Sequence, residues 1–169
     1  MFELKRLSAE GIPRAIEKAE RYRLLNEPSD AESICQDILE VDAAHQRALV
    51  ILLLARTDQF PHPRGAMGVS VASAREVLPR LTSPYERAYY AGIICERWAK
   101  ALRVRGVPGG GATAYQWLRE AMEHYEEAER VRPAGNDDAL LRWNACARLI
   151  TKHPDLKPAP DERAEAMLE

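Results

Sequence analysis

The run from Ala48 to Ala55 constrains the fold more than any other part of this chain. Its eight residues, Ala-Leu-Val-Ile-Leu-Leu-Leu-Ala, carry no polar atom in any side chain. The run is too short to cross a bilayer, which takes about 20 apolar residues. It lies inside a helical pattern from His45 to Asp58, and a helix that is apolar all round has to be covered on every side. We therefore expect other helices to surround it.

The size and charge of the chain limit the classes of partner that it could bind. With 169 residues it is long enough for one domain, which would bury roughly 70% of the surface of the unfolded chain. Lys and Arg total 24 and Asp and Glu total 26, so the formal net charge is -2. This balance argues against nucleic acid and against an anionic membrane as partners.

The three cysteines indicate a reducing compartment. Cys35, Cys95 and Cys146 stand far apart, and each falls in an apolar helical pattern, where free Cys behaves as a small buried hydrophobe. An odd number without paired spacing does not suggest a disulfide framework. The first residues also lack the apolar core of a signal peptide, so we expect the mature protein to be the whole chain, in the cytoplasm.

Helical periodicity runs through most of the chain, while signals for strands and hairpins are nearly absent. Breaks rich in Pro and Gly, at 60–65 and 106–111, separate the helical patterns. The sequence predicts an all-α domain over 1–152, followed by a Pro-rich linker and a short terminal helix over 153–169. The seven helices expected in the domain cover 9–26, 30–41, 45–58, 70–81, 85–104, 113–131 and 137–152.

A recurring spacing links three of these helices. In each of them a small residue is followed by two others at offsets of four and three. The three sets are Ala31, Cys35 and Ile38; Ala74, Leu78 and Leu81; and Ala121, Tyr125 and Ala128. Repeats of this kind indicate stacked helix pairs, because one pair alone leaves an apolar face uncovered.

On these residues the chain resembles the tetratricopeptide repeat family. Helix pairs in that family carry a small, a bulky and a small residue at this spacing in the second helix, and often end in proline, as at Pro133. Ala43 stands where another such proline is expected, and Ala15 where the family has an early Trp. The resemblance implies a right-handed α-solenoid of about three antiparallel helix pairs with a C-terminal capping helix.

The resemblance also implies a binding groove, because the first helix of each pair lines the concave face in this family. The corresponding positions are Ile16, Glu20 and Arg23; Arg47, Val50 and Leu54; Glu86, Tyr89, Ile93 and Arg97; and Leu141, Ala145 and Arg148. An apolar centre with arginines at its edges suits an amphipathic or apolar peptide of a partner protein. The sequence therefore favours a non-catalytic interaction scaffold.

Two other interpretations of the groove residues stay open. In the first, they belong to the core, because a short array can close its groove on itself. In the second, the terminal helix over 161–168 occupies the groove, in the same chain or across a homodimer. A purely structural subunit that forms a homodimer is therefore an alternative function.

A second alternative places a small-ligand or phosphate site, with or without enzymatic activity, where the inter-helix loops lie. A glycine run before a helix N-terminus offers backbone N–H groups to an anion. The residues of this alternative are Arg64, Arg103, Arg105, Gly109, Gly110 and Gly111. The run lacks the Lys-Ser/Thr ending of a phosphate-binding P-loop.

Other chemistry is not indicated by the sequence. The four histidines, at 45, 62, 124 and 153, show no metal-ligand spacing with one another or with the cysteines. No Ser or Cys sits in a nucleophile turn. The acidic residues of 120–129 are typical of a solvated helix face. We therefore expect no metal, no cofactor and no enzyme activity.

Overall fold

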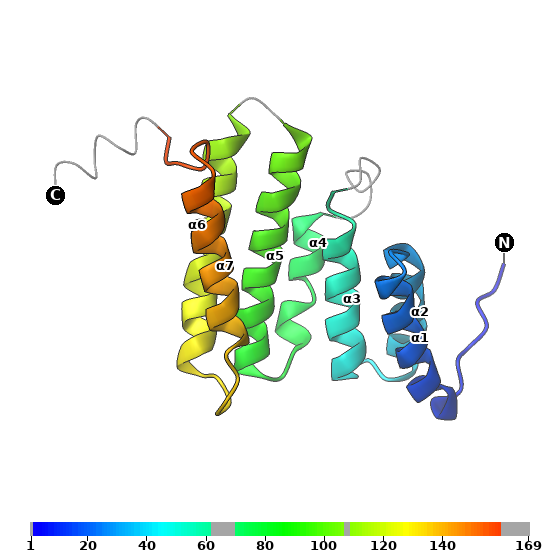
Figure 1. The fold of residues 1–169 in the computed structure, drawn as a ribbon. Helices are drawn as coiled ribbons and strands as arrows, with labels where there is room; N and C mark the ends of the chain where they lie inside the picture. Colours follow the sequence, from blue (N-terminus) through cyan, green and yellow to red (C-terminus); the bar gives the residue numbers. More distant parts are fainter. Residues whose placement is uncertain (1, 62–69, 107–108, 160–169) are drawn as a thin grey trace. The chain divides into compact units, whose positions relative to one another are not determined.

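The computed structural model describes residues 2–61, 70–106 and 109–159, and every regular element in these ranges is helical (Figure 1). The elements are η1 (Ala9–Gly11), α1 (Ile12–Leu24), α2 (Pro28–Val41), α3 (Gln46–Asp58), α4 (Val71–Arg75), η3 (Leu78–Arg80), α5 (Pro84–Arg105), α6 (Gly110–Arg130) and α7 (Asp138–Lys152). The all-α prediction is confirmed for the described residues. The terminal helix expected over 161–168 lies outside them.

The chain divides into two compact units, Met1–Thr82 and Ser83–Glu169. The sequence predicted a single boundary, after residue 152. No Pro- or Gly-rich run marks the division near Thr82, where only the Ser83-Pro84 helix start stands. Among the described residues, no helix has both the length and the apolar character that a membrane span needs.

In the first unit, α3 packs against α1, α2 and α4. Every residue from Ala48 to Leu53 is buried, and so are Ala55 and Thr57. The prediction that the apolar helix is covered by protein is therefore confirmed. Each fully buried Leu or Ile of this run contributes about 1.5–3 kcal/mol relative to an exposed one.

The ends of α3 and α4 show what the sequence patterns missed. His45 precedes α3 as its N-cap, and its Nδ1 accepts a hydrogen bond of 3.2 Å from the backbone N–H of Ala48. One helix was predicted over 70–81, with its last turn disturbed by Pro79, and its length is wrong. A capping box of Ser70 and Ser73 starts α4, which ends at Arg75 and gives way to a 3-10 turn. Pro79 has no N–H with which to continue an α-helix.

In the second unit, α5 and α6 run antiparallel, and α7 packs on α6 (Figure 1). Ser83 caps α5, as the Ser-Pro pair predicts, by accepting a hydrogen bond from the backbone of Glu86. The start of α6 was predicted wrongly: it begins at Gly110, three residues before the expected start at residue 113. Gly109 supplies the left-handed turn before it, with φ of 76°.

A close approach joins α5 to α6 near their middle. A Cβ atom on Gly92 would lie 2.5 Å from the Tyr125 ring, so a larger residue could not occupy this position without a shift. Tyr125 and the neighbouring Ala121 and Ala128 are fully buried. The small-and-bulky spacing noted in the sequence therefore corresponds, in α6, to a packed helix interface.

Residues after α7 also pack onto the second unit. Leu156 is buried, and a Cβ atom on Gly111 would lie 2.4 Å from the carbonyl oxygen of Asp155. The first part of the segment predicted as a linker therefore lies against the N-terminal end of α6.

Candidate functional site

A buried carboxylate connects the three helices of the second unit. The Glu96 side chain on α5 is only 1% exposed, and it accepts hydrogen bonds from Tyr125 Oη at 2.6 Å and from Lys100 Nζ at 2.5 Å. Arg142 on α7 donates to the same carboxylate at 3.4 Å. A buried charge is costly unless it is paired and hydrogen-bonded, and here each of the three helices contributes to that pairing.

Two of the donors to Glu96, Tyr125 and Arg142, keep their protons. Burial, and then the Glu96 charge, raise the pKa of the Tyr125 hydroxyl well above its usual range. Burial disfavours the charge on Arg142, but the Glu96 carboxylate and the Tyr89 side chain outweigh it and raise the pKa of the guanidinium. Both groups therefore remain donors, and Arg142 is held in place between α5 and α7.

An exposed strip of α7 faces away from α6. Ala139 and Cys146 are buried, and Trp143 Nε1 donates to Glu126 of α6 at 2.9 Å, so this side of α7 packs on α6. Leu141, by contrast, is 60% exposed. Ala145 and Arg148, which follow at helical spacing, are exposed as well.

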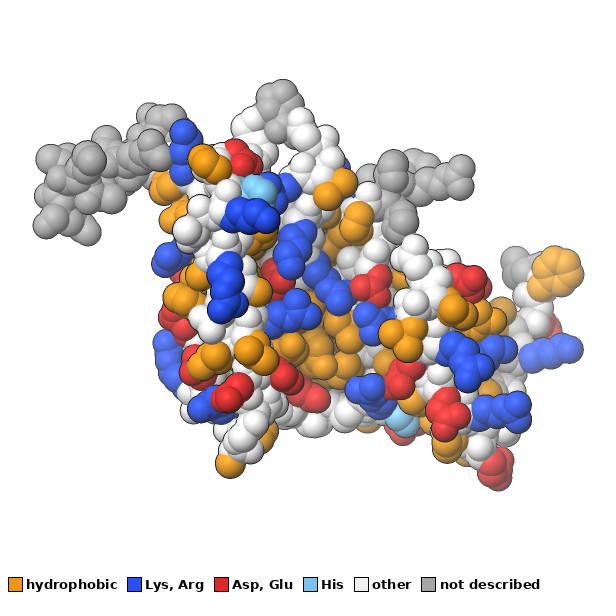
Figure 2. Space-filling model, viewed as in Figure 1, with side chains coloured by type: hydrophobic (Ala, Val, Ile, Leu, Met, Phe, Trp, Pro, Cys, Tyr) orange, Lys and Arg blue, Asp and Glu red, His pale blue; other side chains and the backbone are white. Residues whose placement is uncertain are grey.

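Charge is separated across the second unit. Helix α5 carries five Lys or Arg and two Glu, and α7 carries three Lys or Arg and one Asp, so the two helices together hold eight cations and three anions. Helix α6 has the opposite balance, with two Arg and five Glu. Figure 2 shows Lys and Arg side chains gathered over α5 and α7. We define the α5/α7 face as Lys100, Leu141, Arg142, Ala145 and Arg148.

The predicted groove positions fall into different environments, and their helices divide between the two units. In the first unit, Arg47 pairs with Glu20 at 2.5 Å, and Arg23 pairs with Asp58 at 2.7 Å. Both arginines thus have carboxylate partners within the unit. Ile16 and Leu54 are half-buried there.

Two predicted groove residues are part of the core. Val50 is 3% exposed and Ile93 is 2% exposed, which fits the alternative interpretation of these positions. Tyr89 is half-buried among aromatic rings, with its centroid 5.7 Å from that of Tyr85 and 5.9 Å from that of Tyr125. Arg97 and Glu86 are half-buried on α5.

Several residues of the predicted loop-end site do lie close together, but the carboxylate of Asp155 lies among them. A cavity of about 260 Å³ lies between Arg103, the glycines 109–111 and Asp155. The Asp155 carboxylate is 3.7 Å from Arg103 Nε, and Arg105 lies over the Trp98 ring at 4.9 Å from its centroid. The negative charge of Asp155 offsets the positive charge of Arg103, which a bound phosphate would need. Arg64 lies outside the described residues.

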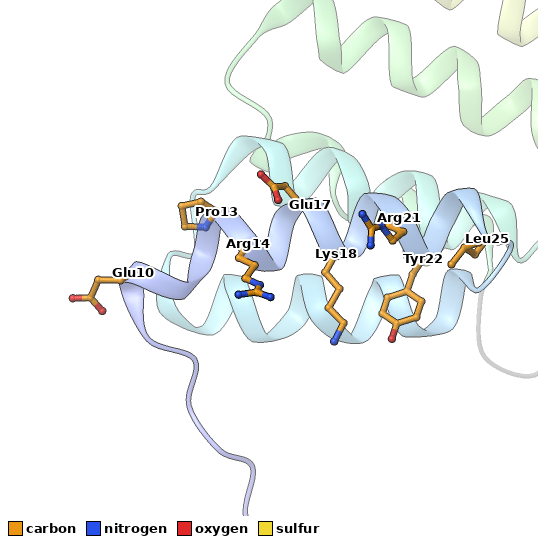
Figure 3. Close-up of a pocket in the computed structure, with 8 residues that line it drawn as sticks. All are labelled: Glu10, Pro13, Arg14, Glu17, Lys18, Arg21, Tyr22 and Leu25. Carbon is orange, nitrogen blue, oxygen red and sulfur yellow. The ribbon is translucent and has the colours of Figure 1, made fainter.

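Another hollow, of about 820 Å³, runs along the outer side of the first helix (Figure 3). Two rows of side chains at helical spacing border it: Glu10, Arg14, Lys18 and Tyr22, and Pro13, Glu17, Arg21 and Leu25. This face was not among the sites predicted from the sequence, although its charged residues recur at intervals of four. The lining residues come from one short stretch of chain and carry mixed charge, which is typical of a solvated helix face.

No family model, curated protein or solved structure matches this chain. The tetratricopeptide resemblance therefore rests on the residues quoted from the sequence and remains a prediction. The second unit has two features that bear on function: the cations of α5 and α7 opposed to the acidic α6, and the exposed strip of α7.

A group of three metal-ligand side chains also forms between α5 and α6. The ligand atoms of Cys95, Glu120 and His124 all lie within 4.8 Å of one another. Sequence spacing alone does not reveal this group, because Cys95 comes from a different helix than Glu120 and His124. The spacing of four between Glu120 and His124 was the one local signal.

Proposed function

We propose that this protein is a non-catalytic interaction module whose α5/α7 face binds an acidic amphipathic segment of a partner protein. The observation that carries the proposal is the charge separation in the second unit, where eight cations and three anions occupy α5 and α7. The peptide expected from the sequence was amphipathic or apolar, and this charge narrows it to an acidic one. We also propose that the helices form a solenoid of the tetratricopeptide type. The spacing of four and three residues that recurs in three of the helices supports this part of the proposal.

The α5/α7 face combines an apolar contact with cations around it. Leu141 is 60% exposed and can take an apolar side chain of the partner. Arg142 is held by Glu96 and still has 39% of its side chain exposed, so its position is set before a partner arrives. Arg148 is exposed, and Lys100 is also exposed although its ammonium group donates to Glu96 at 2.5 Å.

The cations contribute more to association rate and orientation than to affinity. An exposed ion pair contributes about 0.2–1 kcal/mol, so a few of them do not give tight binding alone. They do attract an acidic segment and orient it. An amphipathic helix with apolar residues at i, i+3 or i+4 would place its apolar stripe on Leu141 and Ala145, with its carboxylates near the flanking cations.

Selection from a random peptide library on the full chain tests the proposal. We expect the selected peptides to be acidic and to bind more weakly as salt increases. The variant Leu141→Glu with Arg148→Glu should weaken their binding at least tenfold, or about 1.4 kcal/mol. Glu123→Arg, at an exposed position of α6, is the matched control and should leave binding unchanged.

Neutral or basic selected peptides would contradict the proposal. So would acidic peptides that bind the double variant as tightly as the wild type, provided that far-ultraviolet circular dichroism shows both proteins folded.

A further inference from the structure

We propose that Cys95, Glu120 and His124 form a binding site for a zinc ion between α5 and α6. Their ligand atoms lie within 4.8 Å of one another, and His124 Nε2 is 3.8 Å from Glu120 Oε1. In a tetrahedral zinc site the ligand atoms are about 3.3–3.6 Å apart, given metal–ligand bonds of about 2.0–2.3 Å. Small side-chain rotations, with a closure of about 1 Å, would therefore bring the three atoms into coordination.

The three ligand types favour zinc over other common metals. A thiolate suits a soft or borderline cation, whereas Mg²⁺ and Ca²⁺ prefer oxygen ligands throughout. Zinc accepts sulfur, nitrogen and oxygen together in four-coordinate sites. Three protein ligands leave a fourth position for water. Cys95 is buried at the inner end of the group, while Glu120 and His124 are partly exposed, so an ion can enter from solvent.

A fourth side chain is placed to orient the histidine. Oε2 of Glu127 lies 3.9 Å from His124 Nδ1, on the opposite side of the ring from Glu120. When Nε2 binds a metal, Nδ1 carries the proton and can donate it to that carboxylate. A carboxylate behind a metal-bound histidine fixes the ring and raises its basicity.

The helix packing holds the two halves of the site together. Trp98 and Trp117 make an edge-to-face contact, with ring centroids 6.5 Å apart, about one turn from Cys95 on α5 and from Glu120 on α6. Among the described residues, no other group of three His, Cys, Asp or Glu side chains meets the same spacing. Cys35 and Cys146 are also buried, which makes them suitable control thiols.

Titration of the full chain with Co²⁺, a spectroscopic substitute for zinc, tests the site. We expect one Co²⁺ per chain and a near-ultraviolet absorption from charge transfer between thiolate and cobalt, which zinc abolishes by displacement. Cys95→Ser should remove this absorption, and Cys146→Ser should keep it. His124→Gln and Glu120→Gln should each weaken Co²⁺ binding at least tenfold.

The partly exposed positions decide the test if Cys95→Ser fails to fold, because His124→Gln and Glu120→Gln change side chains that are 31% and 42% exposed. Unchanged Co²⁺ binding in both of these variants would overturn the proposal. An absorption that Cys146→Ser or Cys35→Ser removes would overturn it too, as would no absorption with Co²⁺ in hundredfold excess.

Discussion

The hydrogen bond from Tyr125 to Glu96 gives the sharpest test of how the second unit is held together. Tyr125→Phe removes the hydroxyl and leaves the ring in place against Gly92, so no cavity forms. The carboxylate keeps Lys100 and Arg142 but loses its shortest buried donor, at 2.6 Å. A hydrogen bond to a charged group contributes about 1.5–3 kcal/mol, and we expect a loss of unfolding free energy in that range.

The tryptophans make this loss measurable in one unit. All three Trp residues of the chain, at 98, 117 and 143, lie on α5, α6 and α7. Urea unfolding followed by their fluorescence therefore reports the second unit. Tyr115→Phe, at a half-buried position on α6, is the control and should change the free energy by less than about 0.5 kcal/mol. A change as small as that in Tyr125→Phe would refute the claim that this hydrogen bond holds a buried charge.

Two further predictions concern the first unit and the buried thiols. Arg56 and Glu32 form an ion pair at 2.9 Å with 17% of each side chain exposed, and Arg47 and Glu20 form one with 59% and 36% exposed. Arg56→Ala should therefore lower the free energy of unfolding of the first unit by about 1–3 kcal/mol, and Arg47→Ala should lower it by less than about 1 kcal/mol. Amide hydrogen exchange of α3 measures this free energy, and equal losses in the two variants would contradict the prediction. Burial raises the pKa of the Cys35 and Cys146 thiols to about 12, from 9.0. Their protonated forms thus stabilise the fold fully below pH 9, and this contribution is lost as the pH rises from 9 toward 12. The melting temperature of the double variant Cys35→Ala, Cys146→Ala should therefore change less between pH 9 and pH 12 than that of the wild type. An equal change in both proteins would contradict the raised pKa of these thiols.

Local sequence patterns predicted the core well where every residue of a stretch is apolar. The run from Ala48 to Ala55 has no polar side chain, so its burial followed from the sequence alone. The helix over 70–81 was harder: of the repeated spacing, Ala74 and Leu81 are buried and Leu78 is half-buried, yet the chain between them is not one helix. Apolar spacing reports which side chains are buried, and it does not report whether the backbone hydrogen bonds continue past Pro79.

The candidate site depended on contacts between distant residues, which one sequence does not reveal. Nothing near Glu96 distinguishes it from the solvated glutamates of α6, because its partners Tyr125 and Arg142 lie 29 and 46 residues further on. The arginines at 23 and 47 were placed at the edges of a groove by the resemblance, and each has a carboxylate partner within the first unit. The acidic composition of residues 120–129 was visible in the sequence. That the cation-rich α5 and α7 lie together follows only from the structure, through the contact between Arg142 and Glu96.

The arrangement around Glu96 also predicts how relatives of this chain would vary. Loss of the carboxylate would leave the Tyr125 hydroxyl buried without its acceptor, and loss of Tyr125 or Arg142 would leave a buried charge with fewer donors. Substitutions at these positions are therefore tolerated mainly when they occur together. Homologues should either keep Glu, Lys, Tyr and Arg at this spacing or replace the set with apolar residues. That joint variation would identify a relative whose overall sequence has diverged beyond recognition.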